Sequence, residues 1–388
     1  RHGAGYIRHI LESFSQGQCS AQAAAYELGV SERRIRQLHH EYLRARARGH
    51  GLDWQPGCSG GAHHPAWSPE VETLVRKLLT ARPPASYSFA ASEVHRRLRI
   101  VLDRASVRRW ALRKHIAQPS PRPAVSAGVR RWQRSQIGSL WQLDASPHAW
   151  FPDDPHLYPL LDMLDDCSRL IVGARLYERE TLMAYFDFLD RAFREYGLPL
   201  ALYVDYHSFF FSHDPEALTQ LGKALKFYDI SLLYAPTPQA KGKVERQHLF
   251  WQNRLPAFFS AEAIHQLDQA NPPLDALRQH HNQQEIHREI RQTPQAAWDQ
   301  AVKEGRSTLR PAPACPWWPY IWSLRKQVVV GSDGRVPVAS QRLRVEVAPN
   351  TRIVQCRHPD GSISYLRHRP APDRYPVVLL QWTPIRKV

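Results

Sequence analysis

Three stretches rich in proline or glycine interrupt this chain and limit what it can fold into. They cover residues 51–68, 118–136 and 310–319, and none carries the periodic apolar pattern of a helix or a strand. A chain of 388 residues is also too long for a single hydrophobic core. We therefore expect a multidomain protein in which these three stretches act as linkers.

The first segment, residues 1–50, has the pattern of two helices joined by a turn. Gly29 marks the turn, and Ser31 is a suitable cap for the second helix. Small or apolar residues recur at helical spacing, at Ala25, Leu28, Val30, Ile35 and Leu38. The second helix would then expose a polar face made of Arg33, Arg34, Arg36 and Gln37. We predict a helix-turn-helix DNA-binding domain, with a generic three-helix bundle as the alternative.

A second helical unit is predicted over residues 69–117. Between Ala91 and Ser135 the chain has twelve Lys or Arg residues and two acidic ones. The last helix of this unit carries a basic face made of Arg104, Arg108, Arg109 and Arg113. We interpret the unit as a second DNA-binding domain, although a merely solvated basic face would give the same pattern.

The whole chain is strongly basic, with a formal net charge of +16 and a pI of about 9.9. Such an excess indicates an anionic partner. No run of about 18 apolar residues suggests a membrane span, and no signal-peptide pattern is seen at the start. The five cysteines are scattered without a CxxC pair, which fits a reducing compartment. We expect a cytoplasmic protein.

The pattern changes after residue 136. Three short strands and then alternating helices and strands predict an α/β core of mixed strand pairing over residues 137–260. A helical extension is expected over 261–309. From residue 320 to 388, alternating apolar residues between glycine and proline turns predict a small β-barrel.

Three acidic residues stand out in the α/β region. Asp144 lies in the apolar strand Leu140–Asp144, Asp205 ends the strand Leu200–Asp205, and Glu245 begins a helix. Carboxylates so placed can converge on a pair of divalent cations, which clamp the attacking and leaving oxygens of a phosphodiester. Three nearby cations could hold phosphates, namely Lys241, Lys243 and Arg246. Taken singly, however, each acid could be structural.

Two further acids, Asp165 and Asp166, precede Cys167-Ser168-Arg169. We expect them to shape a hairpin turn rather than to bind a metal ion, with Arg169 as an ion-pair partner for one of them.

The stretch from Ile137 to Trp298 resembles the catalytic core of DDE transposases of bacterial insertion sequences, which are relatives of retroviral integrases. The matching segments are Trp141–Asp144, Leu164–Arg169, Val204–Asp205, Lys241–Arg246, Asn282, His287, Thr293–Pro294 and Trp298. The resemblance implies a ribonuclease-H-like fold. It also implies that Asp144, Asp205 and Glu245 are catalytic ligands of two Mg²⁺ ions, for which Mn²⁺ could substitute.

The resulting hypothesis is a DNA transposase that binds double-stranded DNA at terminal inverted repeats. It would cleave element ends in a metal-dependent reaction, join them to target DNA, and act as a homodimer or higher oligomer. One alternative is a catalytically silent DNA-binding regulator derived from a transposase. Another is a plain ribonuclease-H-type nuclease, which would leave the basic helical units without a role.

Overall fold

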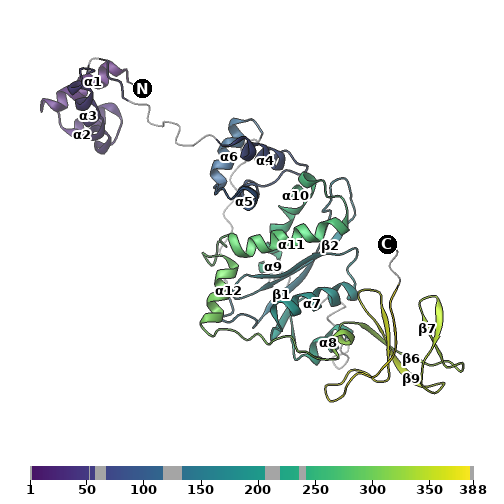
Figure 1. Ribbon diagram of the computed structural model, residues 1–388. Coiled ribbons are helices and arrows are strands. Elements are labelled where there is room, and N and C mark those ends of the chain that lie inside the picture. The colour runs from purple at the N-terminus through teal and green to yellow at the C-terminus, as the bar shows by residue number, and fades with distance from the viewer. Residues whose placement is uncertain are drawn as a thin grey trace. The chain divides into compact units, whose positions relative to one another are not determined.

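The computed structural model divides into two compact units, Arg1–Ser68 and Pro69–Val388 (Figure 1). The structure describes residues 2–51, 53–56, 67–116, 133–205, 219–235 and 242–384. Within these ranges no helix has the length and apolar character needed to cross a membrane.

The first unit is built from three helices, α1 (Ala4–Ser15), α2 (Ala21–Leu28) and α3 (Glu32–Ala47). Gly29 ends α2 in the left-handed conformation with a φ of 62°, and the Ser31 hydroxyl accepts a hydrogen bond from the backbone of α3. The predicted turn and cap are therefore confirmed. One small core holds the helices together, and its most buried members are Leu11, Ala24 and Ile35.

The second unit begins with three further helices, α4 (Pro69–Leu79), α5 (Tyr87–Leu98) and α6 (Arg104–Arg113). The Asp103 carboxylate caps α6 by accepting a hydrogen bond of 2.8 Å from the backbone N–H of Ser106. This helical module, α4–α6, is the predicted second DNA-binding domain. Its role in binding DNA stays a prediction.

A five-stranded mixed sheet forms the centre of the second unit. Its strands are β1 (Trp141–His148), β2 (Tyr158–Asp165), β3 (Ile171–Leu176), β4 (Ala201–Val204) and β5 (Ser231–Tyr234), in the order β3-β2-β1-β4-β5. The first three strands pair antiparallel, whereas β1, β4 and β5 pair parallel. This mixed α/β arrangement fits the ribonuclease-H-like core that the resemblance implies.

Helices cover both faces of the sheet. The helices that contact its strands are α7 (Leu182–Tyr196), α8 (Gln220–Phe227), α9 (Gly242–Gln252) and α11 (Leu267–Gln284). Two further helices pack on these, α10 (Leu255–Glu262) on α9 and α12 (Pro294–Lys303) on α11. Leu143 of β1 faces α7 in the main core, while the next residue, Asp144, faces α9. Successive side chains of a strand point to opposite faces, so β1 supplies the core on one side and the polar site on the other.

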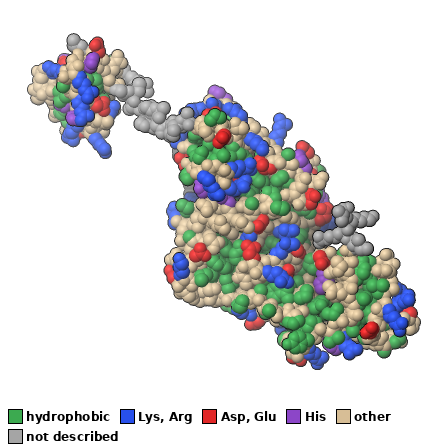
Figure 2. All heavy atoms as spheres, in the orientation of Figure 1, with side chains coloured by type: hydrophobic (Ala, Val, Ile, Leu, Met, Phe, Trp, Pro, Cys, Tyr) green, Lys and Arg blue, Asp and Glu red, His purple; other side chains and the backbone are tan. Residues whose placement is uncertain are grey.

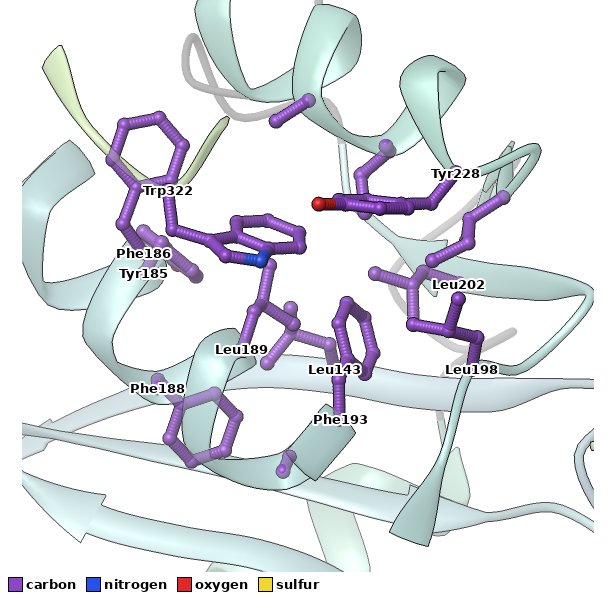
Figure 3. Packing of buried hydrophobic residues seen from close by; sticks show 14 of the residues in the cluster. Leu143, Tyr185, Phe186, Phe188, Leu189, Phe193, Leu198, Leu202, Tyr228 and Trp322 are labelled. Carbon is purple, nitrogen blue, oxygen red and sulfur yellow. The ribbon is translucent and has the colours of Figure 1, made fainter. Parts of the chain in front are cut away.

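An aromatic cluster joins this core to the C-terminal part of the chain. Trp322 follows the short helix α13 (Trp318–Ile321) and packs at centroid distances of 5.5 Å from Phe193 and 5.8 Å from Tyr228 (Figure 3). The backbones of Leu198 and Arg310 also exchange two hydrogen bonds. Residues 310–319, which we expected to act as a linker, therefore lie against the core.

Among the residues that the structure describes, the C-terminal strands do not close into the predicted β-barrel. Its strands are β6 (Leu324–Val329), β7 (Arg335–Val338), β8 (Gln341–Arg344), β9 (Arg352–Arg357), β10 (Ile363–Leu366) and β11 (Val378–Trp382). Within the described residues they form an open sheet, β11-β10-β9-β6, and a separate hairpin, β7-β8. Both faces of β9 are buried, since Ile353 packs with the hairpin and Val354 packs into the main core.

The amides of α11 cover the outer edge of the large sheet. Asn282 accepts a hydrogen bond from the backbone N–H of Ile171 and donates one to its carbonyl, both at 3.0 Å. Asn271 forms the same pair of bonds with Leu176 at the other end of β3. The outward backbone N–H and C=O groups at both ends of β3 therefore have hydrogen-bond partners within the chain.

The helical module α4–α6 is attached to the core by charged and polar contacts. Lys77 and Arg97 both form ion pairs with Glu262 of α10, at 3.0 and 3.2 Å. The hydroxyl of Ser92 in α5 donates a hydrogen bond to Glu285, which directly follows α11. These contacts link the module to two helices of the core.

Glu285 is the most heavily bonded acid of this junction. Arg254 binds it through two hydrogen bonds of 2.7 and 2.8 Å, and His281 contacts it at 2.9 Å. Burial alone would raise the pKa of Glu285, but the charge of Arg254 and the bond to His281 outweigh it. The pKa of Glu285 is therefore held well below its ordinary value.

Replacing Glu285 by Gln should lower the free energy of unfolding by about 3–5 kcal/mol at pH 7, because Arg254 loses its buried partner. The unfolded chain binds a proton at this carboxylate near pH 4.5, whereas the folded chain does so only at lower pH. The wild type should therefore lose stability as the pH falls from about 5, and the variant should show a flatter profile. Chemical denaturation at a series of pH values measures both effects.

The matched control is Asp299→Asn, which changes an exposed acid on α12. It should leave unchanged both the denaturation midpoint at pH 7 and the loss of stability as the pH falls. Equal profiles for the Glu285 variant and the wild type would contradict the assignment.

Candidate catalytic site

Asp144 lies in the middle of β1, on the face that packs against α9. Its side chain is 18% exposed. His248 of α9 reaches it, with 3.9 Å between the His248 Nδ1 and an Asp144 carboxylate oxygen. The Asp144 side chain therefore projects from β1 toward α9, on the face of the sheet opposite the apolar core.

Asp205 directly follows β4, the parallel neighbour of β1. The paired residues are Trp141 with Leu202 and Gln142 with Tyr203. Continuing this register by two residues brings Asp144 level with Asp205, which is exposed. The two acids predicted from the sequence thus lie on adjacent strands at matching heights.

The electrostatics of Tyr185 in α7 support this proximity. Burial raises the pKa of Tyr185 far above its ordinary value, and the nearby charge of Glu180 adds to the effect. The charges of Asp144 and Asp205 raise it further. Both acids therefore act on the same hydroxyl.

Glu245 lies in the first turn of α9 and is exposed. Residues three and seven positions later on the same helix face, His248 and Gln252, both contact β1. Gln252 donates a hydrogen bond of 3.1 Å to the Ser146 hydroxyl. The face of α9 that carries Glu245 is therefore the face that lies along β1.

The described residues do not assemble a complete metal centre. No three His, Cys, Asp or Glu side chains among them are close enough together to hold one ion. The donor set itself suits Mg²⁺, which prefers carboxylate oxygens and retains water ligands. Asp144, Asp205 and Glu245 come from adjacent elements, but their convergence on a metal stays a prediction.

A fourth acid, Asp162, was missed by the sequence analysis. It is fully buried on β2, directly opposite Asp144 in the antiparallel register, and accepts a hydrogen bond of 3.1 Å from Trp251. Burial, with a smaller contribution from Asp144, raises its pKa well above the ordinary value. The available signal was an acid inside the apolar run Leu160–Leu164.

The turn after β2 is held by the two acids predicted to shape it. Asp165 accepts hydrogen bonds from the backbone of Gly138 at 2.8 Å and of Ser168 at 2.7 Å. Asp166 accepts one from the Gln142 side chain at 2.7 Å. An ion pair of 3.9 Å joins Arg169 to Asp166. The structural role expected for this pair is confirmed.

Two of the three cations predicted to hold phosphates near Glu245 have partners inside the protein. Lys243 forms an ion pair with the fully buried Asp166, and burial lowers the pKa of Lys243. Arg246 pairs with Glu289 and stays largely exposed. Lys241 lies outside the described residues. Of the two described cations, Arg246 is the one open to an incoming phosphate.

The predicted DNA-binding residues lie on two helices. Three of the four on α3 are exposed, while Arg34 is half-buried and 3.5 Å from Glu41. On α6, Arg108 is half-buried and the others are exposed, namely Arg104, Arg109 and Arg113. Figure 2 shows Lys and Arg side chains gathered over the helical module α4–α6. Both helices thus present basic surfaces, as the sequence predicted.

Comparison with known proteins places the chain in a family. It is 37% identical over 320 residues to the transposase of insertion sequence IS1202 from Streptococcus pneumoniae, covering 71% of this chain and 67% of the relative. It is 28% identical over 290 residues to y4bF of Sinorhizobium fredii, a protein assigned as a transposase, covering 71% and 60%. No family model matches the chain.

Two solved structures show weaker likeness. The magnesium-bound catalytic core of HTLV-2 integrase, in its trimeric form, is 18% identical, with a TM-score of 0.34 over 42% of this chain and 97% of that one. The simian T-cell lymphotropic virus intasome in complex with the PP2A regulatory subunit B56 gamma is 16% identical, with a TM-score of 0.38 over 76% and 99%.

The sequence relatives decide the class of protein by family membership. The chain belongs to the transposases of bacterial insertion sequences. It spans 60% and 67% of the lengths of the two relatives, so the activity of the whole protein is a matter for proposal.

The contacts of Lys243 and Arg246 predict different effects of the same substitution. Lys243→Met should lower the free energy of unfolding by about 3 kcal/mol, because the buried Asp166 would lose its closer cation and keep only Arg169, at 3.9 Å. Arg246→Met, which removes an exposed pair, should cost about 1 kcal/mol or less. Thermal and urea unfolding of the two variants would measure the difference. Equal losses would contradict the structural role given to Lys243.

Proposed function

We propose that this protein is a DNA transposase whose catalytic residues are Asp144, Asp205 and Glu245. The observation that carries the proposal is the contact between α9 and β1. His248 approaches Asp144, and Glu245 lies on the same face of α9 as His248, so this face is directed toward Asp144. The parallel register of β1 and β4 supports a position for Asp205 beside it. Membership of the transposase family supplies the chemical context.

The three carboxylates would hold two Mg²⁺ ions, and Mn²⁺ could replace them. Bound ions would activate the attacking oxygen and stabilise the leaving oxygen of a phosphodiester. Asp144 is the candidate for the ligand shared by both ions, because it lies between the other two acids. Its half-buried position on a strand would keep its carboxylate in a fixed orientation.

The DNA substrate would be the terminal inverted repeats of the element, followed by target DNA. Recognition of the ends would come from α3, whose first turns carry Arg33, Arg36 and Gln37, since the start of a recognition helix contacts base edges. The basic face of α6 would add backbone contacts. Pairing two ends requires at least a homodimer on DNA, in the bacterial nucleoid.

Asp205→Asn should reduce strand transfer to below about 1% of wild type, a loss of about 2.7 kcal/mol or more in transition-state stabilisation. Binding of end DNA should persist, because the substitution leaves α3 and α6 unchanged. The assay is joining of labelled end oligonucleotides to plasmid DNA in the presence of Mg²⁺, with binding followed by anisotropy.

The matched control is Asp229→Asn, an exposed acid after α8 that should keep full activity. Joining by the Asp205 variant at the wild-type rate would refute the assignment of this acid. A wild type that binds ends but shows no Mg²⁺-dependent cleavage would favour the silent regulator instead.

A double substitution, Arg33→Ala with Arg36→Ala, should weaken the preference for end DNA over random DNA by about 1–3 kcal/mol for each lost base contact. The paired control is Arg44→Ala with Arg48→Ala, which removes the same charge from the other end of α3. It should affect end and random DNA equally. Competition binding at fixed salt distinguishes them, and identical behaviour of the two pairs would rule out base reading by the start of α3.

A further inference from the structure

A cavity of about 280 Å³ lies between α8 and the C-terminal sheet. Its wall includes four cationic side chains, namely Lys223, Arg325, Lys326 and Arg369, and no acidic residue. Three of these cations are exposed at the rim, while Arg325 is half-buried. Among the described residues, none of the four takes part in an ion pair of 4 Å or less, in contrast to the paired cations around Glu285 and Asp166.

Arg325 shows the electrostatic imbalance of this cavity most clearly. Burial lowers the pKa of Arg325, and the groups that oppose this effect are the thiol of Cys356 and the hydroxyl of Tyr228. Burial raises the pKa of both groups, so neither carries a negative charge at neutral pH. A half-buried guanidinium has lost part of its hydration, and an external anion would offset that loss.

The position of Arg325 is fixed by the contact between β6 and α8. Its backbone N–H donates a hydrogen bond of 2.8 Å to the side chain of Gln220, the first residue of α8. The start of α8 also contributes the positive end of its helix dipole to the same wall. The cavity is therefore a built feature of the junction between the catalytic core and the C-terminal sheet.

We propose that this cavity, lined by Lys223, Arg325, Lys326 and Arg369, binds neighbouring backbone phosphates of double-stranded DNA. The proposal rests on the proposed function and extends it to the C-terminal sheet, to which the sequence analysis gave no role. Guanidinium and ammonium groups without acidic neighbours suit phosphate oxygens. Such a contact positions DNA without reading its bases.

The decisive measurement is the salt dependence of DNA binding by the full chain. Lys326→Ala with Arg369→Ala removes two exposed cations from the cavity. If both contact phosphates, the slope of log affinity against log salt should become shallower by about 1.8. The matched pair, Arg335→Ala with Arg344→Ala, removes the same charge from the β7-β8 hairpin. It should leave the slope unchanged, and equal slopes for the two variants would overturn the proposal.

A second readout locates the contact directly. Bound duplex DNA should protect Lys223 and Lys326 from acetylation, while Lys303, exposed on α12, should remain reactive. Sodium phosphate, compared with sodium chloride at matched ionic strength, tests a small ligand as the occupant. Protection by millimolar phosphate but not by DNA would replace DNA with a free phosphate compound and refute the proposal.

The outcomes separate this proposal from the proposed function. If the wild type joins DNA ends but the cavity variant shows the wild-type slope of log affinity against log salt, only the cavity proposal is rejected. A wild type that binds DNA with the expected slope change but never cleaves it would reject the catalytic assignment and leave the phosphate site standing. A wild type that binds no DNA would reject both.

Discussion

The pairing of β1 along both of its edges organises the whole second unit. Trp141 of β1 pairs with Asp165 of its antiparallel partner β2 and with Leu202 of its parallel partner β4, so β1 joins segments that are distant in the sequence. Because side chains alternate along a strand, one face of β1 anchors the aromatic core and the other meets α9. A shift of one residue in this pairing would bury Asp144 in the aromatic core and expose Leu143.

The acids of the sheet have two distinct roles that depend on their surroundings. Asp165 and Asp166 are buried and saturated with hydrogen bonds, so they hold a turn. Asp205 and Glu245 are exposed at the ends of their elements. Asp144 is intermediate, because it lies on a strand but faces a helix rather than the core.

Much of this arrangement follows from local sequence patterns. Alternation and capping predicted the strands, the Ser31 cap and the acidic turn, because these features depend on neighbouring residues. The burial of Asp162 could not be predicted, since its hydrogen bond from Trp251 joins residues 89 positions apart. The predicted β-barrel was not confirmed. Short alternating strands do not reveal that, among the described residues, a hairpin and the tryptophans around α13 pack against the two faces of β9 in an open sheet.

The attachment of α4–α6 to the core has a geometric consequence. The ion pairs of Glu262 and the buried bonds of Glu285 fix the module to α10 and to the end of α11, within the same compact unit as β1. The span from the basic face of α6 to Asp144 is therefore set by packed protein and not by a flexible tether. Under the proposed function, this fixed distance would mean that the position at which α6 binds the DNA determines which phosphodiester bond is cut.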